Sequence, residues 1–156
     1  MPDLTSAPVP PPGPDDHARG EGELLVVYAD LGCAHCAAAW IEIAKRPARV
    51  VFRHFPVASK HPRAPVLHAA AEAAGRQDAF FAMVDSLYAD RGHVDDPHLW
   101  RRAEDLGLDL DRFEADRRSD QVTARVRGDF ETGIRAGVTA TPALFGPAAM
   151  ATADPG

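Results

Sequence analysis

The sequence predicts a mixed α/β fold in which a small sheet is interrupted by a long helical region. Three observations support this prediction. Residues 24–30 and 49–55 are short apolar runs typical of buried strands, and the good helix formers at 37–45 lie between them. Residues 64–136 show helical spacing almost throughout. A further apolar run follows Pro142, as at the start of a strand.

Prolines mark the ends of the first elements. Pro47 ends the helix at 37–45 and Pro56 stops the strand at 49–55, because proline lacks the backbone N–H that would continue either structure. The order strand, helix, strand predicts a βαβ unit with two parallel strands.

The helical region divides into consecutive segments. An alanine-rich segment is closed by a glycine, and later segments begin with residues suited to a first helical turn, such as Pro97. The predicted helices span residues 64–75, 77–89, 97–106, 110–118 and 120–136.

Composition restricts the class of protein. The chain has 156 residues, of which 46% are hydrophobic and 26% charged, as expected for one globular domain with a true core. The net charge of -6 and the lack of a strongly basic stretch argue against nucleic acid or an anionic membrane as partners. No apolar segment approaches the about 18 residues of a membrane span.

The two ends of the chain are expected to be irregular. Residues 1–23 hold six of the fourteen prolines and are expected to form a disordered arm. The same residues lack the features of a secretory signal, so the protein is expected to be cytoplasmic. The domain is expected to span residues 24–145, followed by an irregular tail at 146–156. Dithiols in the cytoplasm are kept reduced, so a cysteine pair there points to chemistry rather than to a permanent cross-link.

The two cysteines of the chain stand together in Cys33-Ala34-His35-Cys36, where a strand runs into a helix. A helix N-terminus favours a thiolate, and His35 adds a cation when it is protonated. Cys33 is therefore the expected nucleophile, and Cys36 lies close enough to resolve a mixed disulfide.

Two other interpretations of the cysteine pair remain open. With His35 or His54 the pair could supply three zinc ligands, although the sequence contains no second CxxC or paired-histidine partner. The two cysteines could also be a purely structural buried pair.

Taken together, these motifs resemble the DsbA-like branch of the thioredoxin superfamily. The resemblance rests on strand-Cys-x-His-Cys-helix, the strand ending at His54-Phe55-Pro56, the helical insert, and Gly137-Val138 followed by Thr141-Pro142. Asp16-His17-Ala18-Arg19-Gly20 is similar to the lead-in of cytoplasmic or antiporter-linked DsbA-like domains.

The resemblance implies a thioredoxin-like fold and a thiol-disulfide oxidoreductase that acts on protein or small thiol and disulfide substrates. Cys33, His35 and Cys36 would be catalytic, Pro142 would be a cis-proline, and Thr141 would present its backbone to the substrate. His35 would favour an oxidising potential. The resemblance implies no cofactor and no metal.

The chain also departs from the family pattern. Val27 stands where some members carry a buried acidic residue, so proton transfer at Cys36 would need another group; Asp30 lies nearer in sequence. The usual last strand and closing helix are missing after Phe145, which would leave an exposed sheet edge that a homodimer could cover.

Two further function classes are considered. One is a redox-sensing or degenerate peptide-binding module of the same fold without significant turnover. The other is a kappa-type glutathione transferase, but those proteins carry serine at the first cysteine position and lack the second cysteine, so the intact pair counts against them.

Overall fold

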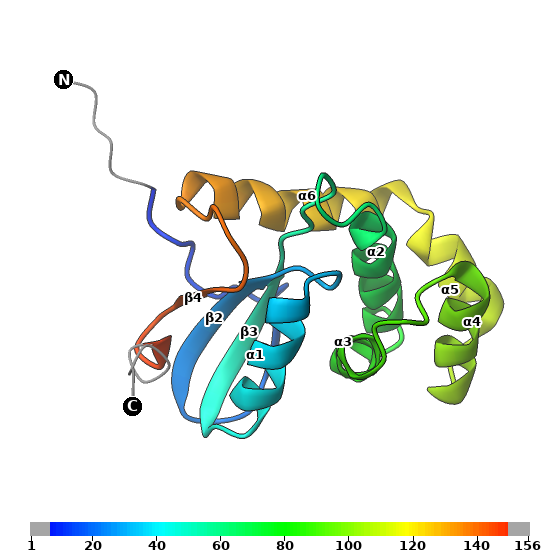
Figure 1. Ribbon diagram of the computed structural model, residues 1–156, viewed down its shortest axis with the longest axis horizontal. Coiled ribbons are helices and arrows are strands. Elements are labelled where there is room, and N and C mark those ends of the chain that lie inside the picture. Colours follow the sequence, from blue (N-terminus) through cyan, green and yellow to red (C-terminus); the bar gives the residue numbers. More distant parts are fainter. Residues whose placement is uncertain (1–6, 150–156) are drawn as a thin grey trace.

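The computed structural model describes residues 7–149 of the chain. Its centre is the predicted βαβ unit: strand β2 (Glu23–Ala29) leads into helix α1 (Ala34–Ala44), which returns to strand β3 (Ala48–His54) (Figure 1). The two strands pair in parallel, which the crossover through α1 makes possible. This confirms the mixed α/β class.

Two short strands complete a four-stranded sheet in the order β1-β3-β2-β4. Strand β1 (His17–Arg19) pairs antiparallel with β3, and strand β4 (Ala143–Phe145) pairs antiparallel with β2. The short outer strands are the two edges of the sheet, where unpaired backbone groups are exposed to other chains unless something covers them.

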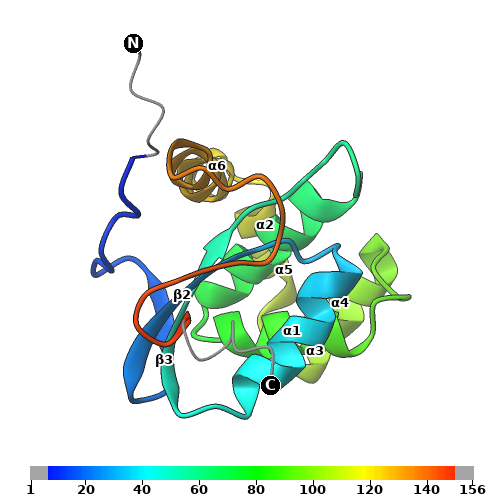
Figure 2. The same ribbon diagram turned by 60° about the vertical axis from the view of Figure 1, so that its left-hand side comes forward.

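The sheet is buried on both faces. Along β2, Leu25 and Val27 point into the larger apolar cluster with α1 and the insert helices, whereas Val26 and Tyr28 point into a smaller cluster on the opposite face. Figure 2 shows α1 on one side of the strands and α6 on the other. Both faces being covered explains why β2 is a continuous apolar run rather than an alternating one.

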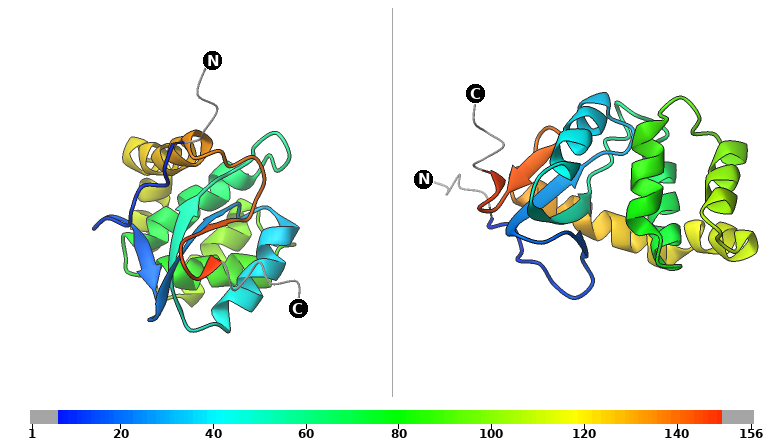
Figure 3. Two further views of the ribbon diagram at one scale, coloured as in Figure 1. Left: turned by 90° about the vertical axis from the view of Figure 1, so that its left-hand side faces the viewer. Right: turned by 90° about the horizontal axis from the view of Figure 1, so that it is seen from below.

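The insert is helical, as the spacing predicts. Most of its helices stand to one side of the sheet, and α6 runs from them back over the sheet (Figure 3, right). Side chains cap the last three helices by accepting a hydrogen bond from a backbone N–H of the first turn. The helices are α2 (Ala64–Gly75), α3 (Phe80–Ala89), α4 (Asp96–Asp105), α5 (Leu110–Arg117) and α6 (Asp120–Arg135).

The expectation of a disordered arm before residue 24 is wrong for its described part, because residues 17–19 form strand β1. Specific contacts hold the segment before the strand: the Ala7 amide donates to the Arg135 carbonyl at 2.9 Å. The Asp16 carboxylate accepts from the buried Arg53 guanidinium at 3.0 Å. The sheet therefore begins before residue 24, and residues 1–6 lie outside the described residues.

The expected irregular tail can be followed only as far as residue 149, and residues 150–156 lie outside the described residues. After β4 the chain turns back, and the Ala148 amide donates to the Leu24 carbonyl at 3.1 Å. Ala148 is buried in the larger cluster. The start of the tail thus covers part of the sheet face beside α1.

Among the helices of residues 7–149, none has both the length and the apolar character needed to cross a bilayer.

Candidate functional site

Cys33 is the residue that caps the N-terminus of α1. Its backbone is extended, with φ -95° and ψ 126°, and its sulfur accepts a hydrogen bond from the Cys36 amide at 3.4 Å. The Cys36 N–H of the first turn is thus directed at the Cys33 sulfur, and the positive end of the helix dipole stabilises negative charge there. The structure places this thiol at the helix N-terminus that the sequence predicts.

Cys36 lies deeper in the protein than Cys33. It is 2% exposed, against 8% for Cys33, and its sulfur accepts from the Asp30 amide at 3.4 Å. Burial raises the pKa of Cys36 to about 12. The two thiols are chemically unequal: Cys36 stays protonated until a reaction partner draws its proton away.

The segment before β4 faces the nucleophile from the other side. The Thr141–Pro142 peptide bond is cis. The carbonyl oxygen of Thr141 lies 4.0 Å from the Cys33 sulfur. The structure thus brings together Cys33, Cys36 and Thr141 from parts of the chain about a hundred residues apart.

His35 differs from the cysteines in its surroundings. It is exposed in the first turn of α1. Within residues 7–149 its side chain makes no hydrogen bond or ion pair, so any effect on the thiols acts through its charge near the helix end.

The loop that leads into Cys33 has every amide bound. The Gly32 amide donates to the Asp30 carboxylate at 2.8 Å, and the Cys33 amide donates to the Asp30 carbonyl at 3.1 Å. The Leu31 amide donates to His68 Nε2 at 2.9 Å. His68 does not stand out in the sequence, because a lone histidine within an alanine-rich helix belongs to no recognisable pattern.

The structure does not favour His54 as a ligand shared with the thiols. Its Nδ1 lies 2.7 Å from His68 Nδ1 and its Nε2 lies 2.8 Å from Glu72 Oε1. The group of potential ligands that residues 7–149 gather is His17, His54 and Glu72, which includes neither cysteine. Both ring nitrogens of His54 are thus used within the core.

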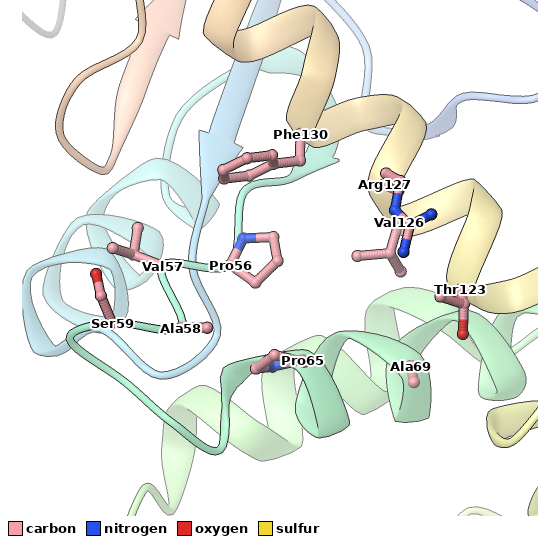
Figure 4. Close-up of a pocket in the computed structure, with 10 residues that line it drawn as sticks. All are labelled: Pro56, Val57, Ala58, Ser59, Pro65, Ala69, Thr123, Val126, Arg127 and Phe130. Carbon is pink, nitrogen blue, oxygen red and sulfur yellow. The ribbon is translucent and has the colours of Figure 1, made fainter.

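An apolar groove of about 480 Å³ opens between α6 and α2 (Figure 4). Val126 and Phe130 line it from α6, Pro65 lines it from α2, and residues 56–59 close one end. The groove adjoins the active-site loop through Val57, whose amide donates to the Asp30 carboxylate at 2.9 Å.

The unequal thiols give a first prediction. In the reduced protein, Cys33 should react with iodoacetamide at neutral pH about tenfold or more faster than Cys36, because the thiolate is the reacting form and burial raises the pKa of Cys36 to about 12. Mass spectrometry of peptides after short alkylation times measures both rates. Equal rates at the two thiols would contradict the assignment of Cys33 as nucleophile.

Comparison of the sequence with known proteins shows which family the chain matches. The family model described as thioredoxin matches residues 16–146. A Na(+)/H(+) antiporter NhaA of Herminiimonas arsenicoxydans is 36% identical over 153 residues, which cover 92% of this chain and 24% of that protein. A Na(+)/H(+) antiporter NhaA 1 of Salinispora arenicola is 40% identical over 86% of this chain and 22% of that protein. The chain spans about a quarter of the length of these curated relatives.

Solved structures of similar fold include DsbA proteins. The alpha-DsbA1 of Wolbachia pipientis gives a TM-score of 0.72 at 23% identity, with 86% of this chain and 75% of that chain covered. A thioredoxin-like oxidoreductase of Silicibacter pomeroyi gives 0.74 at 23% identity over 85% of this chain and 80% of that chain. At these identities the likeness concerns the fold, which is the one the sequence motifs predict.

Proposed function

The chain belongs to the thioredoxin family, which it matches over residues 16–146, and on this premise we propose that it is a thiol-disulfide oxidoreductase. Cys33 is its nucleophile and Cys36 its resolving thiol. One observation carries the proposal: the Cys33 sulfur caps helix α1 and faces the Thr141 carbonyl across 4.0 Å. A structural pair of cysteines would have no need of a sulfur placed at a helix N-terminus.

The reaction begins at Cys33. Its thiolate attacks one sulfur of a substrate disulfide, a new S–S bond forms, and the other substrate sulfur leaves as a thiolate that takes up a proton. Cys36 then loses its proton and attacks the Cys33 sulfur, which releases the second substrate thiol and leaves a Cys33–Cys36 disulfide. Two electrons pass from the dithiol to the substrate. In the reverse direction a substrate dithiol is oxidised.

The substrate would lie along the segment before β4. The Thr141 carbonyl lies 4.0 Å from the Cys33 sulfur, so the backbone of Thr141 and the adjacent Pro142 would meet an extended substrate, and protein or small thiol and disulfide compounds are the proposed partners.

Turnover tests the proposal. The wild-type protein should accelerate the reduction of insulin by dithiothreitol above the uncatalysed rate, and titration against glutathione should give a defined potential for the Cys33/Cys36 pair. A wild-type rate equal to the uncatalysed one would refute the proposal and favour a peptide-binding module without turnover.

The charge of His35 gives a second prediction. Replacing His35 with Ala should shift the potential towards reducing values by on the order of 30 mV, equivalent to about 1.4 kcal/mol, because the Cys33 thiolate loses a favourable charge or hydrogen-bond donor. Glutathione titrations of both proteins measure the shift. An unchanged potential would mean that the helix N-terminus alone sets it.

Strand β4 gives a third prediction, which concerns a homodimer. As an edge strand it can pair with a second copy of the chain, and association would stabilise the protein by mass action. We expect sedimentation and the melting midpoint to depend on concentration over a hundredfold range. A monomer with a constant midpoint would show that the turn after β4 closes this edge sufficiently.

A further inference from the structure

Three ionisable side chains lie buried behind the active-site loop and take no part in the proposed exchange. His54 and His68 are 0% exposed and Glu72 is 6% exposed. Burying such groups is costly unless each finds a partner, and well-packed apolar residues would stabilise a core at least as well. Their hydrogen bonds therefore call for a functional explanation.

The hydrogen bonds of these three side chains have a single order of donors and acceptors. The Leu31 amide can only donate, so His68 Nε2 must accept and the His68 proton must sit on Nδ1. His68 Nδ1–H then donates to His54 Nδ1 at 2.7 Å, which leaves the His54 proton on Nε2. That proton is donated to Glu72 Oε1 at 2.8 Å.

The protonation states agree with this order. Burial lowers the pKa of His68 to about 4, which keeps its ring neutral. Burial alone would raise the pKa of Glu72, but the hydrogen bonds from His17 and His54 hold it below its ordinary value. Glu72 is therefore a carboxylate able to accept from both rings.

A metal site is the competing interpretation, since His17, His54 and Glu72 present ligand atoms within 4.8 Å of one another. A metal on His54 Nε2 would move the His54 proton to Nδ1 and the His68 proton to Nε2. That N–H would then face the Leu31 amide at 2.9 Å, donor against donor, and the acceptor beside it, Asp30 Oδ1, lies 3.6 Å away, too far for a good hydrogen bond. The Arg125 guanidinium, 3.9 Å from Glu72 Oε1, also opposes a cation. Hydrogen bonding accounts better for the cluster.

We propose that His68 is a positioning residue for Cys33: held by His54 and Glu72, its neutral ring fixes the Leu31 amide and so the loop that presents the nucleophile. Of the acceptors for the three loop amides, His68 is the one supplied by another element, helix α2, whereas Asp30 supplies the other two. This inference rests on the proposed function. Its chemical reason is that attack on a disulfide needs the sulfur held in a defined place and direction.

Two substitutions separate positioning from mere packing. Gln at position 68 keeps an acceptor oxygen for the Leu31 amide and an NH₂ group as donor, whereas Leu has neither acceptor nor donor. Leu99→Ala, at a buried position of α4 in the insert, is the control for lost stability alone. All four proteins are compared below their melting temperatures.

We expect His68→Leu to slow two reactions of Cys33, alkylation by iodoacetamide and mixed-disulfide formation, about tenfold or more. In His68→Gln both rates should stay within about threefold of wild type, and in Leu99→Ala they should be unchanged. Nitrogen NMR of the wild type should show a neutral His68 ring protonated on Nδ1. The alkylation rate and the ring signals need no turnover, so they test this inference even if insulin reduction fails.

Three results would overturn the inference. One is a folded His68→Leu protein that reacts at the wild-type rate. Another is equal slowing by Leu and Gln, which would show that the acceptor is not what matters. The third is uptake of one equivalent of Zn²⁺ by the wild type that His17→Ala abolishes, since a bound metal requires the opposite hydrogen-bond order.

Discussion

Replacing Cys33 with Ser is expected to lower insulin reduction by about two orders of magnitude or more, to the uncatalysed rate. A serine hydroxyl is not ionised at neutral pH and cannot form the S–S bond of the mixed disulfide. The fold should persist, because serine can accept the Cys36 amide hydrogen bond at the helix cap in place of sulfur. Circular dichroism and the insulin assay on the same preparation measure both effects.

The matched control is Cys36→Ser, which keeps the nucleophile and removes the resolving thiol. This protein should accumulate a covalent mixed disulfide with the substrate that dithiothreitol releases, and Cys33→Ser should accumulate none. Accumulation on Cys36 in the Cys33→Ser protein instead would reverse the two roles.

The stability of the protein should depend on pH through His68. In the unfolded chain His68 takes up a proton below its ordinary pKa of 6.5, whereas in the folded protein burial lowers that pKa to about 4. The unfolded state therefore binds more protons in this window. The free energy of unfolding should fall by on the order of 3 kcal/mol between pH 6.5 and 4.

Denaturant unfolding at several pH values measures this loss. His68→Gln cannot titrate, so its stability should change less over the same window. Glu72 affects stability at lower pH than His68 does. Its pKa is held below the ordinary 4.5, so its contribution to the free energy of unfolding is lost as the pH falls below that value. A His68→Gln curve parallel to the wild type would contradict the assigned source of the acid sensitivity.

Local patterns predicted most elements of this fold. Helix α2 spans Ala64–Gly75, the predicted bounds, and α1 begins at Ala34 with Cys33 as its cap, at the helix N-terminus that the sequence predicts for this cysteine. Strand β1 was missed because three residues of mixed character carry no alternation. Its pairing with β3, about thirty residues further along the chain, is a contact that no local pattern reveals.

The sequence predicted some residues of the candidate site and not others. Spacing and helix physics pointed to Cys33 and Cys36, whereas Thr141 and Pro142 rested on family resemblance, since an X-Pro pair before an apolar run is common. The contact of His68 with Leu31 joins two elements 37 positions apart and depends on the tautomer of a ring. Periodicity and propensity contain no information of that kind.

Strand β1 also bears on how the molecule can move. Its backbone is paired to β3, while His17 bonds Glu72 of α2 and Arg19 bonds Asp85 of α3 in a bidentate pair at 2.8 and 2.9 Å. One edge strand thereby fastens two insert helices to the sheet. A hinge between insert and sheet would have to break both contacts, so strand β1 restrains movement of α2 and α3 relative to the sheet.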